Sequence, residues 1–155
     1  MIKVLIITYY WPPSGGPGVQ RVLKFSKYLS EYGLQPIILT VKNGEYPAID
    51  NTFEKDIPKN CIVYKTNSLE PNKLYRKLTG MKKEDKIPVV VLSDTNVSWK
   101  KKILHWFRLN LFIPDAKIGW IPFALNEGKK IIKLEKPDII FSSSPPPTVH
   151  LIANK

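Results

Sequence analysis

The chain has 155 residues, 14 prolines, one cysteine and a net charge of +11 at neutral pH. This length is enough for one domain with a hydrophobic core and short for two. The lone cysteine excludes an internal disulfide, and neither a signal peptide nor a membrane-spanning run of about 20 apolar residues is found. We therefore expect one cytoplasmic domain, soluble or peripheral on the inner face of the plasma membrane.

The first thirty residues predict a strand, a glycine-rich loop and a helix. Residues 4–7 are a continuous apolar run of the kind buried in a parallel sheet. Residues 11–18 are rich in proline and glycine, which cannot continue a strand. From Val19 the apolar residues Val22, Leu23, Phe25 and Leu29 recur with helical spacing, and Gly33 is placed as a helix C-terminal glycine.

The glycine loop departs from two known phosphate-binding motifs. A dinucleotide fingerprint has glycine where Arg21 stands, and an acidic residue after the second strand, where residues 40–42 have none. A P-loop is absent because no Gly-Lys-Ser/Thr follows. Gly15, Gly16 and Gly18 still precede a helix N-terminus, whose N–H groups favour an anion. We favour a bound phosphate over a tight turn that binds nothing.

The rest of the chain alternates strands and helices. Strands are predicted at residues 36–41, 61–66 and 138–141, the first and last of them buried. A helical turn is predicted at 51–55, helices at 98–112 and 119–135, and another helix from Thr148. In the helix predicted at 119–135, five apolar residues should face inward: Ile121, Ala124, Leu125, Ile131 and Ile132. Strands separated by helices in this order pair in parallel, so we expect an open α/β fold.

Short segments near both ends of the chain carry a family resemblance. Residues 4–7, the run PPSGGPGVQR at 12–21, Leu29 with Gly33, and IILT at 37–40 resemble the start of the family 4 glycosyltransferases. The segments IPD at 113–115, GW at 119–120, PDII at 137–140 and SSSPP at 142–146 are similar to the same domain in capsule and cell-wall polysaccharide members.

The resemblance implies a Rossmann-like three-layer α/β/α domain with a mainly parallel sheet, one half of a GT-B fold. Residues 1–155 would be the N-terminal acceptor-side domain. The pattern stops inside a helix, so we expect a piece of a longer protein, with the donor-binding domain absent and the fragment inactive alone.

The resemblance also implies the reaction, a retaining transfer of a hexosyl group from a nucleotide-sugar to a saccharide or polyprenyl-linked acceptor. No obligatory metal or other cofactor is implied. Gly15, Gly16 and Gly18 would face the donor diphosphate. Many relatives have a histidine-bearing segment after the fourth strand, where this chain has three serines, so no catalytic residue is assigned.

The loop after the fourth strand is a candidate acceptor site. Ligands bind outside the carboxyl ends of parallel strands, so this loop should face the same cleft as the glycines. We expect Ser143 and Ser144 to hydrogen-bond the acceptor; a serine run that caps a helix is the alternative. Asp115 and Trp120 are weaker candidates on the acceptor side. His105, His150 and Cys61 lack paired ligand spacing, so no metal site is predicted.

The helix predicted at 98–112 is basic and aromatic. Between residues 73 and 108 ten basic residues stand against three acidic ones, which accounts for +7 of the net charge. Two interpretations stay open: an ordinary helix with its aromatic residues in the core, or a helix on an anionic membrane surface. The membrane residues would be Trp99, Lys100, Lys101, Lys102 and Trp106. Nucleic-acid binding is disfavoured because no known binding module is present.

The leading hypothesis is therefore the N-terminal domain of a glycosyltransferase of surface-polysaccharide synthesis. The alternative is a non-catalytic basic Rossmann-like module that docks on membrane or nucleic acid. The donor sugar, the nucleotide and the acceptor are not indicated by the sequence.

Overall fold

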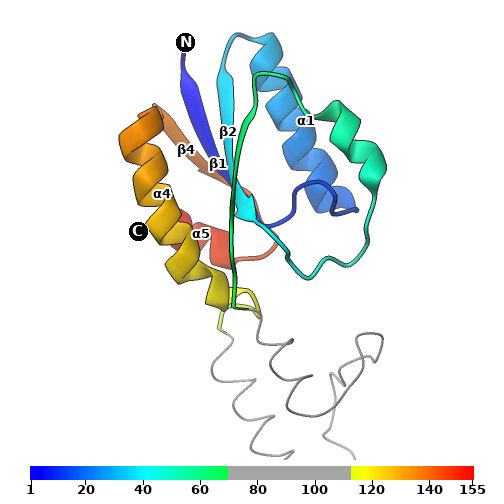
Figure 1. The fold of residues 1–155 in the computed structure, drawn as a ribbon, viewed down its shortest axis with the longest axis vertical. Helices are drawn as coiled ribbons and strands as arrows, with labels where there is room; N and C mark the ends of the chain where they lie inside the picture. Colours follow the sequence, from blue (N-terminus) through cyan, green and yellow to red (C-terminus); the bar gives the residue numbers. More distant parts are fainter. Residues whose placement is uncertain (70–112) are drawn as a thin grey trace, which may run out of the picture.

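The computed structural model describes residues 1–69 and 113–155. Within them, four parallel strands form one sheet in the order β3-β2-β1-β4 (Figure 1). The strands are β1 (Lys3–Ile7), β2 (Gln35–Val41), β3 (Ile62–Thr66) and β4 (Ile139–Ser142). The α-helices are α1 (Pro17–Glu31), α4 (Ile121–Glu135) and α5 (Thr148–Ala153), and the 3-10 helices are η1 (Asn51–Asp56) and η2 (Ile118–Trp120).

Parallel pairing brings the ends of the strands together. In the register, Leu5 of β1 lies opposite Ile37 of β2 and Ile140 of β4. The loops that follow β1, β2 and β4 therefore leave the sheet on the same side, where the strands finish. We call this side the carboxyl end of the sheet and the opposite side its amino end. The parallel α/β organisation expected from the strand–helix order is confirmed, and it is of the Rossmann-like kind.

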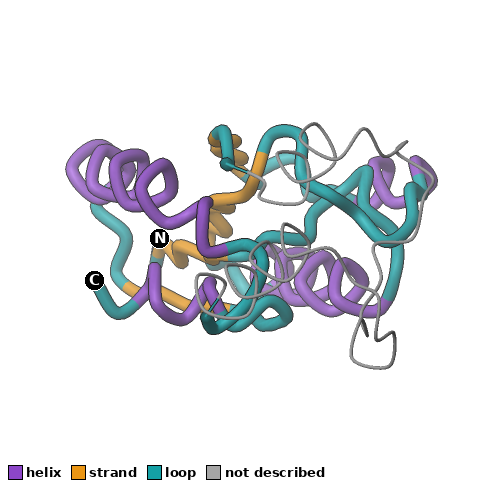
Figure 2. The backbone as a smooth tube through the Cα atoms, turned by 90° about the horizontal axis from the view of Figure 1, so that it is seen from below, coloured by secondary structure: helices purple, strands orange, loops and turns teal. Residues whose placement is uncertain are grey.

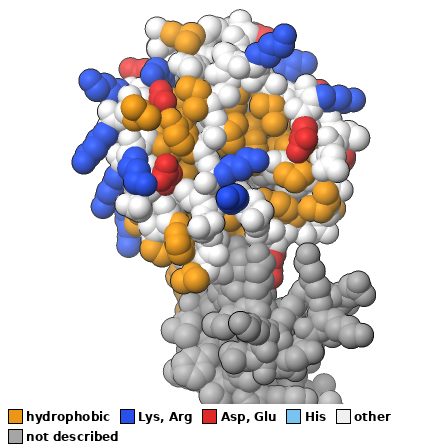
Figure 3. All heavy atoms as spheres, viewed as in Figure 1, with side chains coloured by type: hydrophobic (Ala, Val, Ile, Leu, Met, Phe, Trp, Pro, Cys, Tyr) orange, Lys and Arg blue, Asp and Glu red, His pale blue; other side chains and the backbone are white. Residues whose placement is uncertain are grey.

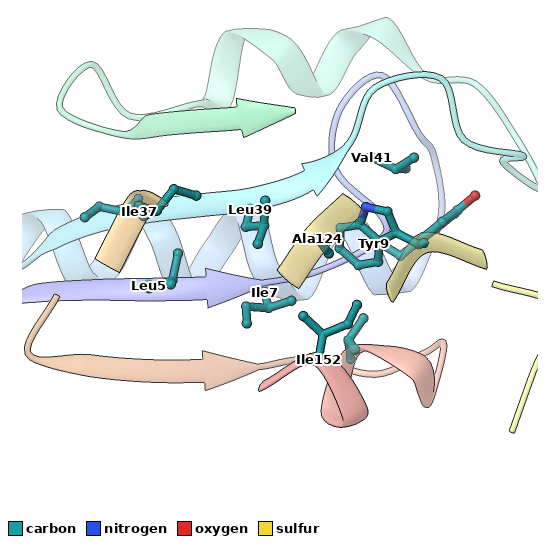
Figure 4. Packing of buried hydrophobic residues seen from close by; sticks show 11 residues of the cluster. Leu5, Ile7, Tyr9, Ile37, Leu39, Val41, Ala124 and Ile152 are labelled. Atoms are coloured by element: carbon teal, nitrogen blue, oxygen red, sulfur yellow. The ribbon is translucent and has the colours of Figure 1, made fainter. Parts of the chain in front are cut away.

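Alternate residues of the strands feed two separate core clusters because successive side chains point to opposite faces. Leu5, Ile7 and Leu39 pack with residues of α4 and α5, among them Ala124 and Ile152 (Figure 4). Val4, Ile6 and Ile38 pack instead with Val22 and Leu23 of α1, and with the partly buried Phe53 of η1. Figure 2 shows the strands running between these helical segments.

The structure corrects the prediction that the fourth strand is buried. Ile139, Ile140 and Phe141 are 48, 46 and 41% exposed, whereas Ile6 and Ile38 are fully buried. The reason is position, because β4 pairs with β1 and stands at an edge of the described sheet. An apolar run is equally compatible with a central strand and with an edge strand.

Two helix positions also differ from the periodic pattern. Phe25 of α1 is 46% exposed and packs edge-to-face on Phe141 of β4, with ring centroids 5.8 Å apart. Ile132 of α4 is 44% exposed, while Ala124 and Ile131 are buried. Gly33 takes the left-handed φ of 76° expected at a helix C-terminus.

No helix within the described ranges is long and apolar enough to cross a membrane. The helix predicted at residues 98–112 lies outside the described residues, and so do Trp99, Lys100, Lys101, Lys102 and Trp106.

Candidate functional site

The first half of the glycine loop is fastened to the segment after β2. The Gly15 N–H donates to the Ala48 carbonyl at 2.9 Å, and Ser14 forms an antiparallel bridge with Ile49. A Cβ on Gly15 would lie 3.3 Å from the Cβ atoms of Ala48 and Asp50, closer than most real contacts. Glycine at this position is therefore explained by packing, and its N–H is already used within the protein.

The second half of the loop opens α1 and leaves backbone accessible. Gly16 is the N-cap residue with φ 101°, and a Cβ there would meet no atom within 4 Å. No side chain caps the helix, its first turn has no acidic residue, and Pro17 has no N–H to offer. The first-turn N–H groups of such a helix carry roughly half a positive charge in total. This end of α1 is therefore suited to an anion.

Gly18 stands between the glycine loop and the loop after β4. A Cβ on Gly18 would lie 3.6 Å from the Tyr10 ring and 3.9 Å from Pro145 Cδ, both ordinary contact distances. The structure therefore tolerates alanine here, and a methyl group would cover the backbone beside the N–H. Gly18 is the position at which a side chain should hinder a bound anion without disturbing the fold.

Residues 142–147, the last residue of β4 and the loop that follows it, lie against the start of α1. The Ser143 N–H donates to the Ile7 carbonyl at 3.2 Å, and the Arg21 guanidinium donates to the Ser144 carbonyl. The structure thus brings the glycines and the serines to the same edge of the sheet. The N-cap residue of α5 is Pro147, so neither Ser143 nor Ser144 caps that helix. Ser143 is buried and Ser144 half-buried.

Asp115 holds the start of α5 in place. Its Oδ2 accepts hydrogen bonds from the Thr148 N–H at 2.7 Å and from Thr148 Oγ1 at 2.8 Å. Its Oδ1 accepts from the Lys117 N–H at 2.7 Å. The carboxylate therefore satisfies a helix N-terminus that has no cap of its own. Asp115 lies near the candidate site, but both its oxygens are engaged by the protein.

Trp120 is a core residue. Its side chain is fully buried, its Nε1 donates to Thr66 Oγ1 at 2.7 Å, and its ring packs edge-to-face on Tyr9 at 5.6 Å. The indole therefore packs in the core at the carboxyl end of the sheet, and no face of its ring is open to a ligand.

A charged and aromatic cluster at the carboxyl end was not anticipated from the sequence. Lys117 is buried, pairs with Glu45 at 3.3 Å and lies 5.0 Å from the centre of the Tyr9 ring. The Tyr9 hydroxyl accepts from the Glu45 N–H at 3.2 Å, and Tyr10 packs edge-to-face on Tyr9. The one available signal was position, since Tyr9 and Glu45 each follow a predicted strand.

Polar groups near the amino end form a closed network. Glu135 accepts from the Tyr64 hydroxyl at 2.7 Å and pairs with Lys3 Nζ at 3.1 Å. The Tyr64 hydrogen bond, followed by that of Lys3, lowers the pKa of Glu135, and the same bond with Glu135 raises the pKa of Tyr64 to about 12. Burial raises the pKa of the Cys61 thiol to about 12, so it is not a reactive thiolate at neutral pH.

Metal-ligating side chains do not gather within residues 1–69 and 113–155: no three of His, Cys, Asp and Glu are placed to hold an ion. His150 Nδ1 forms a hydrogen bond of 2.8 Å with Ser142 Oγ at the end of β4. Lysine and arginine side chains are spread over the face seen in Figure 3, with hydrophobic side chains between them.

Comparisons of the chain with models of known families, with curated proteins and with solved structures found no match. The candidate site is an uncapped helix N-terminus beside a serine- and proline-rich loop at the carboxyl end of a parallel sheet.

Proposed function

We propose that the chain is the acceptor-side domain of a GT-B glycosyltransferase, with a three-layer α/β/α arrangement. The enzyme would transfer a sugar from a nucleotide-sugar to a saccharide or lipid-linked acceptor in surface-polysaccharide synthesis. The observation that carries the proposal is the start of α1, where Gly16 and Gly18 leave an uncapped helix N-terminus beside the loop at 142–147. A diphosphate is the part of a nucleotide-sugar that this chemistry recognises.

The roles divide between the two loops. The N–H groups of the first turn of α1 would bind a phosphate of the donor, because backbone donors and the helix dipole both favour negative charge there. Gly15 has a different role, since it lets the loop pack on residues 48–50. Of the three glycines expected to face the diphosphate, the proposal therefore keeps two, Gly16 and Gly18.

The loop after β4 would form the acceptor side. Ser144 is the better placed of the two serines to contact a sugar hydroxyl, because it is half-buried and Ser143 is buried. Asp115 would act through the loop by anchoring Thr148, and Trp120 would support the floor of the site. Neither of these two would touch the sugar.

Binding of inorganic pyrophosphate and of UDP to the 155-residue chain tests the diphosphate role. NMR titration should shift the amides of Gly18 and Val19 first, because both belong to the first turn of α1. Gly18→Ala should weaken binding about tenfold or more, because the added methyl group would keep the anion from the N–H, and a lost hydrogen bond to a charged group costs about that much. The fold should be unchanged, because the added Cβ has room.

Gly128→Ala is the matched control. Gly128 is a helical glycine of α4 whose added Cβ would lie 3.6 Å from Leu39, away from the glycine loop. The same change of residue should leave pyrophosphate binding unaltered. Equal binding by Gly18→Ala and the wild type would remove the diphosphate role.

The membrane partner is a separate part of the proposal, because a lipid-linked acceptor would reach the enzyme at the bilayer surface. Co-sedimentation of the chain with anionic vesicles, before and after Lys100, Lys101 and Lys102 are changed to Glu, tests it. Loss of vesicle binding is expected, and unchanged binding would exclude a role for these lysines.

A further inference from the structure

Arg21 connects two segments that are distant in the sequence. It lies in the second turn of α1, and its guanidinium donates to the carbonyl of Ser144, 123 residues away. Gly18, three residues earlier on the same helix, faces Pro145 of the same loop. The Arg21–Ser144 hydrogen bond thus joins the start of α1 to the loop at 142–147, and Gly18 lies close to the same loop.

No charge interaction within α1 accounts for an arginine at this place. A cation near a helix N-terminus gains nothing from the helix dipole, and the first turn has no acidic residue to pair with it. No ion pair between Arg21 and an Asp or Glu occurs in the described part of the chain. A guanidinium has five N–H donors in a planar fork, so one carbonyl leaves several of them for another acceptor.

The loop has attachments that do not involve Arg21. Ser143 is held by the Ile7 carbonyl, and Thr148 by the Asp115 carboxylate. Arg21 itself is exposed. Removing its side chain should therefore leave the domain folded and release only the middle of the loop, at Ser144.

We propose that Arg21 is a positioning residue that couples the anion site of α1 to the serine loop. Its guanidinium fixes the Ser144 carbonyl and, when a phosphate is bound at the start of α1, bridges that phosphate to the loop. Binding of the donor would then order the serine loop, which forms the proposed acceptor side. This inference rests on the proposed function, because it assigns a second role around the same anion.

The test compares the wild type with Arg21→Gln and Arg21→Lys, using inorganic pyrophosphate as the probe. The readouts are the dissociation constant, the Ser144 carbonyl ¹³C shift and the backbone order parameters of Ser143 and Ser144. In the wild type, pyrophosphate should raise both order parameters and move the carbonyl shift. Arg21→Gln should weaken binding about tenfold, as expected for a charge-assisted hydrogen bond, and abolish the ordering.

Arg21→Lys separates charge from geometry. Lysine keeps the positive charge but lacks the fork, so it should recover part of the affinity without recovering the ordering of Ser144. Lys24→Gln is the control for charge alone, because Lys24 is exposed on the same helix one turn further on. It should change the dissociation constant less than about twofold, because separated surface charges are screened by salt.

The possible failures are distinct. If pyrophosphate shifts Gly18 and Val19 but Ser144 behaves alike in the wild type and Arg21→Gln, the coupling is wrong and the proposed function stands. If pyrophosphate shifts nothing in the wild type, the diphosphate function and the coupling both fail. Recovery of Ser144 ordering by Arg21→Lys would show that charge is enough, and would overturn the role of the fork.

Discussion

The amino and carboxyl ends of the sheet contain different kinds of polar structure. Near the amino end, Glu135 is shared by Tyr64 and Lys3, and the Lys3 N–H donates to Asp138 Oδ2 at 2.7 Å. At the carboxyl end, α1 begins without a side-chain cap. Side chains from three elements bond one another at the amino end, whereas the first turn of α1 at the carboxyl end has no side-chain cap. The candidate site is identified by these uncapped backbone donors.

Trp120→Ala should have the largest effect on stability, because it removes a buried core side chain at the carboxyl end. The side chain is fully buried and bonds Thr66, so we expect a loss of about 3–5 kcal/mol in the free energy of unfolding. Urea denaturation measures it. A loss below about 1 kcal/mol would mean that the indole does not support the core.

Asp115→Ala should come next. It leaves the Thr148 N–H and hydroxyl without their acceptor, at a cost of about 1–3 kcal/mol in unfolding free energy. The double variant with Thr148→Val measures the coupling of the pair. Purely additive losses would show that Asp115 does not stabilise α5 through Thr148.

The amino-end network should make stability depend on pH at both extremes. The folded pKa of Glu135 is below its ordinary 4.5, so its stabilisation exists above that value and is lost as the pH falls through the lowered pKa. The pKa of Tyr64 is raised from 10.0 to about 12, so its contribution is present below pH 10 and is lost as the pH rises towards 12.

Because these groups lie near the surface, we expect each effect to stay within about 1 kcal/mol. Glu135→Gln should flatten the acid side of the stability profile, and Tyr64→Phe the alkaline side. Tyr28→Phe, at an exposed position of α1, is the control and should change neither. An unaltered alkaline limb in Tyr64→Phe would contradict the assignment.

Gly18→Ala should have the smallest effect on stability and the opposite sign. Alanine in a helix is favoured over glycine by about 0.5–1 kcal/mol, and the added Cβ makes only ordinary contacts. A variant that unfolds at a higher temperature while losing pyrophosphate would sharpen the contrast between the two ends. Destabilisation would show that Gly18 is needed for packing, as Gly15 is.

Much of the fold was predictable because its signals are local. The apolar runs predicted all four described strands, and helical spacing predicted α1, α4 and the start of α5. The position of Gly33 was predicted from helix-capping chemistry. The candidate site was predictable only in outline: the glycine loop and the serine loop follow strands, and parallel pairing brings such loops to one edge.

What the individual residues do was decided by tertiary structure. Three glycines look alike in the sequence, yet Gly15 packs tightly on residues 48–50, Gly18 has room for ordinary contacts, and Gly16 faces open space. Trp120 is a candidate acceptor-side residue in the sequence, yet its indole is inside the core.

Local pattern therefore determined which segments are strands and helices and where the glycine loop stands. Only the folded chain decided that β4 stands at an edge of the described sheet, that Lys117 pairs with Glu45, and that Arg21 meets Ser144. The reason is physical. Propensity and periodicity act between near neighbours, whereas exposure and ion pairing depend on which distant segment arrives alongside.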